Sequence, residues 1–423
     1  MKKKRRRGNP LMILLMLLAI GGLIYINLYV VPDMEPPFVP TPTATRPPES
    51  YLEEADALAL EGKFLGAIEA YQAAINADPK NVETYLKIAR LQIYNNMLPQ
   101  AKVNSQNAIL LNNQIADAYA LLGWVNGFQK DYMEGEKNAL KAIEIDPNSS
   151  LGHAIYAFLL GLRIEADLRD LDTMDKAIEE SRTAVALNPS LLEAHWARGY
   201  ILELTSNYEE AVAEYEKALA INPNVSDLHM AMGRNLFTLR RNQEAIFEFS
   251  KAFALNPSNA DANRYISLVW QNEGEYAKAV QYADEAVKIR PTDPYLHANL
   301  GTMYFRQALY NQAIPPLQLA VRGGKTEDED IVEPIPLDYR NGSIAIFTRY
   351  GVSLARVNRC TEAGEVANEM LSGVPDDAIA VDNANEILRI CQENLSNPPT
   401  ATPAPTPTYQ SGPTSTPQPT SQP

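Results

Sequence analysis

The stretch YEEAVAEYEKALAINPN, residues 208–224, decides the fold because it reads as an amphipathic helix closed by an Asn-Pro pair. Ala211, Tyr215 and Ala218 follow one another at spacings of four and three, which places them on one face of a helix. The proline ends that helix, since it lacks an N–H and forces its predecessor out of the helical region. The same ending recurs along the chain as Asp-Pro, Asn-Pro or Arg-Pro.

These terminal prolines return with a fixed period. Intervals of 34 residues, or twice 34, separate most of them, and one interval is 34 plus 8: Pro79, Pro147, Pro189, Pro223, Pro257 and Pro291. A period of this length marks a repeat architecture in which each unit is a helix, a turn and a second helix. Small residues also recur where the paired helices must approach closely: Ala67, Ala101, Gly135, Ala177, Ala211, Ala245, Ala279 and Ala313.

The repeat resembles the tetratricopeptide repeat, with its W-x2-L-G-x2-Y, A-x3-F and closing A and P pattern. Residues 116–149 match through Tyr119, Leu122, Gly123, Tyr132, Ala142 and Pro147, and residues 294–327 through Leu300, Gly301, Tyr304, Tyr310, Ala313 and Ala320. The resemblance is to the membrane-anchored, bacterial envelope type. It implies an all-α, right-handed superhelical solenoid over residues 49–395, with about nine units and a C-terminal capping helix over 378–394. The expected units begin near residues 48, 82, 116, 150, 192, 226, 260, 294 and 344.

The chain departs from the pattern at three places. Asn113 stands where a terminal proline is expected. The fourth unit carries eight extra residues around RIEADLRDLD, 163–172, which equal about two helical turns. We expect four of them to lengthen each helix, which keeps the apolar faces in phase. Residues 323–343 are too rich in proline and glycine for a helix, so we expect an interruption there.

The N-terminus predicts a membrane anchor. Residues 1–10 are strongly basic, and residues 11–31 carry no charge and span about 31 Å as a helix, close to the bilayer's hydrocarbon thickness. Because Lys and Arg stay cytoplasmic, we expect the N-terminus inside and the repeats outside, in the periplasm or cell envelope. A cleaved signal peptide is the alternative, with Ala19-Ile20-Gly21 as its cleavage site, but ten largely apolar residues follow that site.

Composition separates the remaining segments. Residues 32–48 form a Pro/Thr-rich linker, and residues 396–423 form a Pro/Thr/Ser/Gln-rich tail that we expect to be disordered. The formal net charge is -15, and residues 2–7 contribute +6, so the rest carries -15 - 6 = -21. Such an acidic body repels phosphate backbones, which argues against a nucleic-acid partner.

No residue pattern outside the repeats predicts catalysis, a cofactor or a metal. His153, His195, His229 and His297 share the fourth position of their units, where we expect packing residues rather than metal ligands. GGKT at 323–326 lacks the earlier glycine of a phosphate loop, and EDED at 327–330 is expected to be a solvated loop. We therefore expect a binding protein and not an enzyme.

The resemblance also implies where a ligand binds, since first helices of such units line the concave face. Positions 2, 5, 9 and 12 of these helices define a stripe, and we take as candidate groove residues those on it, with Phe128 one position beyond: Trp124, Phe128, Phe158, Trp196, Tyr200, Met230, Arg234, Phe237 and Arg264. Arg306 continues the arginines. Packing between neighbouring first helices is the alternative role for the aromatic residues. The arginines lead us to expect a partner whose apolar segment has an acidic flank.

Two classes of function follow. The first is a membrane-tethered scaffold that binds proteins through its groove and contacts the lipid bilayer through residues 11–31. An accessory subunit of a secretion, pilus or polysaccharide-assembly machine is one version of it. The second is an envelope glycan-binding module, because aromatic faces also stack on sugars.

The chain's two cysteines lie near its C-terminal end. Cys360 opens the second helix of the ninth unit and Cys391 lies late in the capping helix. Antiparallel packing of these helices would bring the sulfurs together, and an exported domain favours oxidation. The alternative is that each thiol fills a small apolar space.

Overall fold

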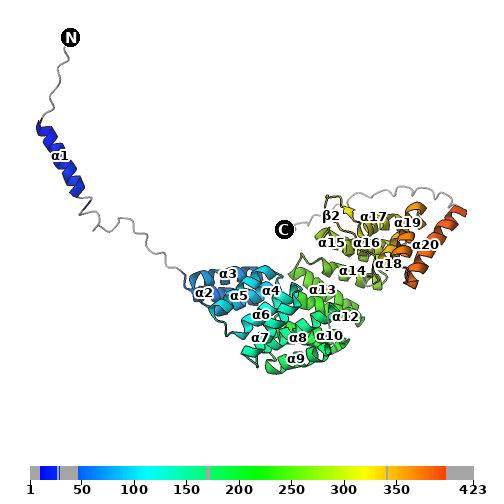
Figure 1. Cartoon of the computed structure of the whole chain (residues 1–423), viewed down its shortest axis with the longest axis horizontal. Coiled ribbons are helices and arrows are strands. Elements are labelled where there is room, and N and C mark those ends of the chain that lie inside the picture. The colour runs from blue at the N-terminus through cyan, green and yellow to red at the C-terminus, as the bar shows by residue number, and fades with distance from the viewer. Residues whose placement is uncertain (1–9, 26–27, 29–45, 168–171, 340–341, 397–423) are drawn as a thin grey trace, which may run out of the picture.

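The computed structural model describes residues 10–25, 28, 46–167, 172–339 and 342–396, and these residues form helices almost throughout (Figure 1). Nine helix pairs follow one another. The first helices of the pairs are α2 Pro48–Leu60, α4 Val82–Tyr94, α6 Ala116–Phe128, α8 Ser150–Glu165, α10 Leu192–Leu204, α12 Ser226–Thr238, α14 Ala260–Asn272, α16 Pro294–Arg306 and α18 Ser343–Arg356. The second helices are α3 Phe64–Ala77, α5 Leu98–Leu111, α7 Tyr132–Ile145, α9 Thr173–Leu187, α11 Tyr208–Ile221, α13 Asn242–Leu255, α15 Tyr276–Ile289, α17 Tyr310–Arg322 and α19 Cys360–Gly373.

A single helix precedes the pairs. This helix, α1, covers Pro10–Tyr25, and none of its residues is buried. Among the described residues, no helix combines the length and the apolar character needed to cross a membrane. Most of the remaining residues of the expected anchor, 26–27 and 29–31, lie outside the described part of the chain, as do the linker's residues up to 45 and the tail from 397. The anchor stays a prediction.

The recurrent Asx-Pro endings close the second helices through the Asx side chain. Asn222 ends α11, and its Oδ1 accepts a hydrogen bond from the backbone N–H of Asn224 at 3.0 Å. Such a side-chain acceptor replaces a backbone turn. Asn112 forms the same turn with the N–H of Gln114 at 2.9 Å. The second unit therefore ends correctly although Asn113 replaces its proline.

The turn inside each unit has one residue in the left-handed region. These residues are Gly62, Asn96, Lys130, Asp167, Ser206, Arg240, Gly274, Ala308 and Asn358. In the turns other than that of Asp167, whose next residue lies outside the described part of the chain, the next residue donates its N–H to a carbonyl five positions earlier, as Asn207 does to Leu202 at 2.9 Å. This geometry caps the carbonyls at the end of the first helix.

Small residues hold the two helices of a unit together. Ala211 and Ala218 of α11 are fully buried. Gly199 of α10 lies against the ring of Tyr215, and a Cβ at this glycine would stand 2.6 Å from a ring carbon. The glycine is therefore required by the close approach of the helices.

The fourth unit corrects one expectation. Helix α8 has 16 residues and α9 has 15, against 13 in α10 and 14 in α11. Only (16 - 13) + (15 - 14) = 4 of the eight extra residues extend helices, so the expected gain of four in each helix was wrong. Asp167 takes a left-handed conformation (φ 57°) and ends α8, so the other four residues enter the connection. Within that connection, residues 168–171 are not described.

The interruption after α17 is a short hairpin. Strands β1 Gly324–Lys325 and β2 Ile331–Val332 pair antiparallel, with Gly324 opposite Val332. Val332 and Ile335 are buried, and the N–H of Ile335 donates to the Ala320 carbonyl at 2.8 Å. The segment thereby packs onto the eighth unit before α18 begins. Helix α20, Ala378–Ser396, then covers α18 and α19.

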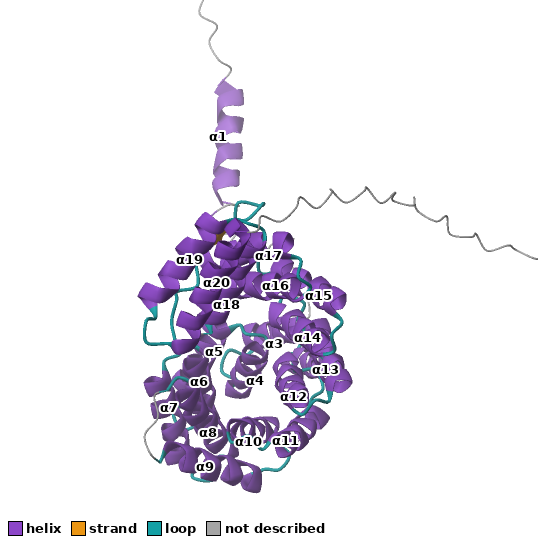
Figure 2. Cartoon of the chain, turned by 90° about the vertical axis from the view of Figure 1, so that its right-hand side faces the viewer, coloured by secondary structure: helices purple, strands orange, loops and turns teal. Residues whose placement is uncertain are grey.

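The stack of repeats curves so that its first two units contact the fifth unit and its junction with the sixth. In Figure 2 the helices form a ring, with α4 drawn inside it. The contacts agree, because Tyr94 of α4 donates a hydrogen bond to Glu193 of α10 at 2.8 Å. The Asn224 side chain, between α11 and α12, also donates to the Leu60 carbonyl at 3.5 Å. The second unit therefore lies within the concave face of the later units.

Candidate functional site

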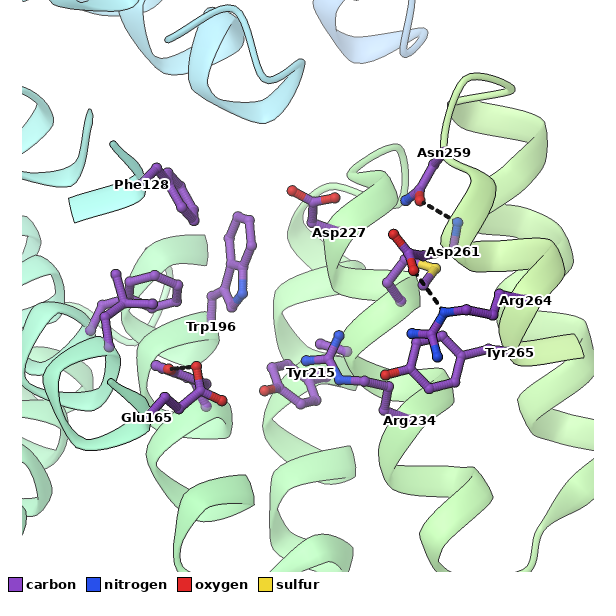
Figure 3. Close-up of a pocket in the computed structure, with 15 residues that line it drawn as sticks. Phe128, Glu165, Trp196, Tyr215, Asp227, Arg234, Asn259, Asp261, Arg264 and Tyr265 are labelled. Carbon is purple, nitrogen blue, oxygen red and sulfur yellow. Dashed lines mark hydrogen bonds and ion pairs between the residues drawn. The ribbon is translucent and has the colours of Figure 1, made fainter. Parts of the chain in front are cut away.

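A cavity of about 500 Å³ opens on the concave face between the third and seventh units (Figure 3). First helices supply most of its walls. Seven of the nine candidate groove residues line it: Phe128, Phe158, Trp196, Tyr200, Met230, Arg234 and Arg264. The other two do not. Trp124 lies beneath the wall with 1% of its surface exposed, and Phe237 packs into the cluster around Phe249. We call this cavity the concave pocket.

The aromatic residues of the pocket also pack on one another. The ring centroids of Trp124 and Trp196 are 5.3 Å apart in an edge-to-face arrangement, and those of Phe158 and Tyr200 are 4.7 Å apart. Phe128 stacks on Trp124 at 5.9 Å. Such pairs add about 0.5–1.5 kcal/mol each beyond the area they bury. The aromatic rings of the stripe therefore pack mainly on one another, and only the ring edges that remain exposed line the cavity.

Helix α4 closes the N-terminal side of this concave face. Arg90 forms an ion pair with Glu193 at 3.0 Å, and the Tyr94 hydroxyl donates to the same carboxylate. The Tyr94 ring lies 6.3 Å from the Trp196 ring. Glu193 is 2% exposed, and its charge raises the pKa of the Arg90 guanidinium. We call the contact of Arg90 and Tyr94 with Glu193 the latch.

The arginines of the pocket are already paired. Arg234 contacts Glu203 through Nε at 3.2 Å, and Arg264 contacts Asp261 through Nε at 2.9 Å. Arg290 reaches the other oxygen of Asp261 at 3.0 Å. The expectation of an acidic flank on the partner loses its basis at Arg234 and Arg264, because carboxylates of the chain itself neutralise both.

Two further acids line the pocket, and they differ in their partners. Glu165 accepts a hydrogen bond from the Tyr200 hydroxyl at 2.6 Å. Asp227 has neither a hydrogen bond nor an ion pair from its side chain to any described residue, and its carboxylate points into the open space beside Trp196 (Figure 3). Burial raises the pKa of the Asp227 carboxyl, and the charge of Arg234 opposes that shift. The candidate groove residues did not include Asp227, although it stands at position 2 of the stripe.

The four histidines are buried or half-buried between helices, as packing residues would be. In His195, Nδ1 lies 2.6 Å from Glu214 and Nε2 lies 2.8 Å from the Pro189 carbonyl. Both ring nitrogens face acceptors, so the doubly protonated ring satisfies both, and the hydrogen bond with Glu214 raises the pKa of His195. The sequence prediction missed this Glu partner, although His153 and His229 have one as well. Across the described ranges, no group of three or more His, Cys, Asp or Glu side chains is placed to hold a metal ion.

The two cysteines form a disulfide between α19 and α20. The Cα atoms of Cys360 and Cys391 are 5.5 Å apart. Antiparallel packing of the two helices brings the start of α19 beside the end of α20. The bond therefore ties the capping helix to the last repeat.

Comparisons with known proteins identify the repeats. Family models of the tetratricopeptide repeat match residues 48–81, 116–149, 192–225 and 230–294, so the chain contains tetratricopeptide repeats. Repeats of this kind are typically non-catalytic scaffolds for protein binding. No curated protein matches the sequence.

Solved structures give weaker likenesses. PilF of Pseudomonas aeruginosa is 24% identical over 48% of this chain and 90% of its own, with a TM-score of 0.40. A tetratricopeptide repeat protein from Parabacteroides merdae is 14% identical over 60% of this chain and 98% of its own, with a TM-score of 0.37. The MamA protein is 24% identical over 42% and 92%, with a TM-score of 0.28. These scores are too low to establish a shared path of the whole chain.

Proposed function

We propose that this protein is a membrane-tethered scaffold that binds a segment of another protein in the concave pocket, outside the cytoplasm. The observation that carries the binding role is the pocket itself. It has about 500 Å³ of space, aromatic walls and an unpaired carboxylate. Concave sites that combine aromatic walls with placed polar groups are a usual form of a binding site.

Two observations support the location. The uncharged run over residues 11–31 follows a basic N-terminus, which is the pattern of an anchor with its N-terminus inside. The disulfide between Cys360 and Cys391 fits an oxidising compartment, where such bonds persist.

Topology is tested with reporters fused after residue 423. We expect alkaline phosphatase, which folds only after export, to be active there, and green fluorescent protein exported unfolded to be dark. Fusions placed after residue 10 serve as the matched control and should give the reverse pattern. An active cytoplasmic reporter after residue 423 would refute the proposed location.

Binding is tested with Trp196→Leu, which removes an aromatic wall. We expect this variant to bind proteins from an envelope extract with lower affinity. Because leucine keeps part of the apolar volume, we expect the helical circular dichroism signal to stay intact. Trp270→Leu is the control, because Trp270 stands outside the concave pocket, under Lys278. Equal binding by both variants and the unmodified chain would refute a role for the pocket.

A glycan-binding module is the second candidate, favoured by the aromatic rings that line the pocket. Protease treatment of an envelope extract separates the two candidates. A protein ligand is lost after trypsin digestion, whereas a glycan ligand survives it and is lost after periodate oxidation.

A further inference from the structure

One position of the repeat places acids on the concave face. Glu193, Asp227 and Asp261 are each the second residue of their unit, 34 residues apart, and each lies in the first turn of its helix. They differ in what neutralises them. Arg90 pairs with Glu193, and Arg264 and Arg290 pair with Asp261. Asp227 stands between them without a partner among the described residues.

The latch shows what one of these acids binds. Arg90 reaches Glu193 from a helix that is not its neighbour in the stack, and it does so across the concave face. Tyr94, one helical turn further on, packs its ring near Trp196. Arg90 of α4 therefore neutralises the carboxylate at the second position of the fifth unit. Tyr94 of the same helix packs near Trp196, three residues after that carboxylate.

We propose that Asp227 binds an arginine side chain of the partner segment, with the aromatic walls of the concave pocket packing against the guanidinium. This inference rests on the proposed function, and it names the side chain of the partner that the pocket recognises. A guanidinium forms two parallel hydrogen bonds to a carboxylate and stacks on aromatic faces. Phe128 keeps part of its ring exposed in the same cavity as Asp227, and Phe158 and Trp196 present ring edges there.

A structural role alone does not account for Asp227. An acid in the first turn of α12 interacts favourably with the helix dipole, and this explains why an acid is tolerated there. Exposed acids obtain that benefit in water. Asp227 is instead half-buried in the wall of the concave pocket, and this burial raises its pKa, while Arg234, whose charge lowers that pKa, is held by Glu203. A partner's cation would complete the site.

The experiment uses the full-length chain in detergent and a phage-displayed library of random dodecapeptides. Peptides that Trp196→Leu fails to retain are kept as pocket ligands and synthesised. We expect them to contain an arginine. Replacing it by citrulline, which has nearly the same shape and no charge, should weaken binding at least about tenfold, as loss of a buried charged partner does. Fluorescence anisotropy measures each affinity.

Asp227→Asn should cause a similar loss, while Glu216→Gln, which removes one exposed negative charge from α11, should bind normally. If Asp227→Asn fails to fold, a benzophenone placed beside the arginine of the peptide still maps the contact on the unmodified chain. We expect cross-links to α10 or α12.

The outcomes are distinct. Pocket ligands that lack arginine, tolerate citrulline, bind Asp227→Asn with unchanged affinity or cross-link elsewhere would overturn the arginine proposal and leave the proposed function standing. A selection that yields no peptide dependent on Trp196 would overturn both.

Discussion

The latch makes a prediction about how tightly the second unit is held in the concave face. Glu193→Ala removes the carboxylate that Arg90 and Tyr94 share. The variant leaves the Arg90 guanidinium without its counter-charge and the Tyr94 hydroxyl without its acceptor. In the unmodified chain, burial and the charge of Glu193 hold the pKa of Tyr94 well above its usual value, which fits its hydroxyl as the donor in this hydrogen bond.

The magnitude follows from burial. Breaking a buried ion pair by removing one partner costs about 3–5 kcal/mol. Arg90 keeps 34% of its side chain exposed, so water replaces part of the lost interaction. We therefore expect about 2–3 kcal/mol, at or below the lower end of that range. At 1.4 kcal/mol per factor of ten, this corresponds to local opening that is roughly 30- to 150-fold more frequent.

Amide hydrogen exchange measures that opening helix by helix. We expect faster exchange in α4 of Glu193→Ala, with α18 unchanged because repeats stabilise chiefly their neighbours. The double variant Arg90→Met with Glu193→Leu is the control, since apolar replacement of both partners is often neutral. Exchange in α4 that stays within twofold of the unmodified chain, or an equal increase in α18, would refute the role of the latch.

Two further predictions concern the ends and the middle of the stack. Replacing Cys360 and Cys391 by serine removes a cross-link between residues 31 positions apart and should cost about 3–4 kcal/mol of stability on the chain-entropy model. Amide hydrogen exchange should accelerate in α19 and α20 alone, and unchanged protection of these helices would contradict the prediction. The pKa of His195 is raised in the folded state, so its pairing with Glu214 stabilises the fifth unit fully below the unfolded pKa of about 6.5. That stability is lost as pH rises through the raised folded pKa, so denaturation of the unmodified chain should become easier in that window while His195→Gln shows a flatter profile; parallel pH profiles would rule the pairing out.

Local features made the helices predictable from the sequence. A helix end depends on the residues next to it, such as Asn222 and the proline after it, and this local signal recurs in most of the nine units. The insertion in the fourth unit was less predictable, because its eight residues fit either longer helices or a longer connection. The left-handed residue Asp167 decided between them, and nothing in its sequence neighbourhood separates it from a helical aspartate.

The sequence predicted seven of the residues that line the concave pocket, but not which of their charges are paired with other residues of the chain. The resemblance to the tetratricopeptide repeat implies that Phe128, Trp196 and Arg234 lie on the concave side, and all three line the pocket. Whether an arginine on that stripe is free depends on acids elsewhere, such as Glu203 on the preceding first helix. One signal was available and was missed. Position 2 belongs to the groove stripe, and Glu193 and Asp227, 34 residues apart, show that an acid recurs at that position.

The latch also limits what the pocket admits. A second cavity of about 310 Å³ lies along Asp227, and Ile93 and Asn96 from the end of α4 line it together with Arg290. Helix α4 therefore borders the concave pocket on its N-terminal side. A segment that enters from the seventh unit meets Asp227 and must then turn away or displace α4. Displacement would break the pair of Arg90 with Glu193, so a longer segment gains contacts only after offsetting that loss. For the partner segment proposed above, we therefore expect a short segment with its arginine near one end.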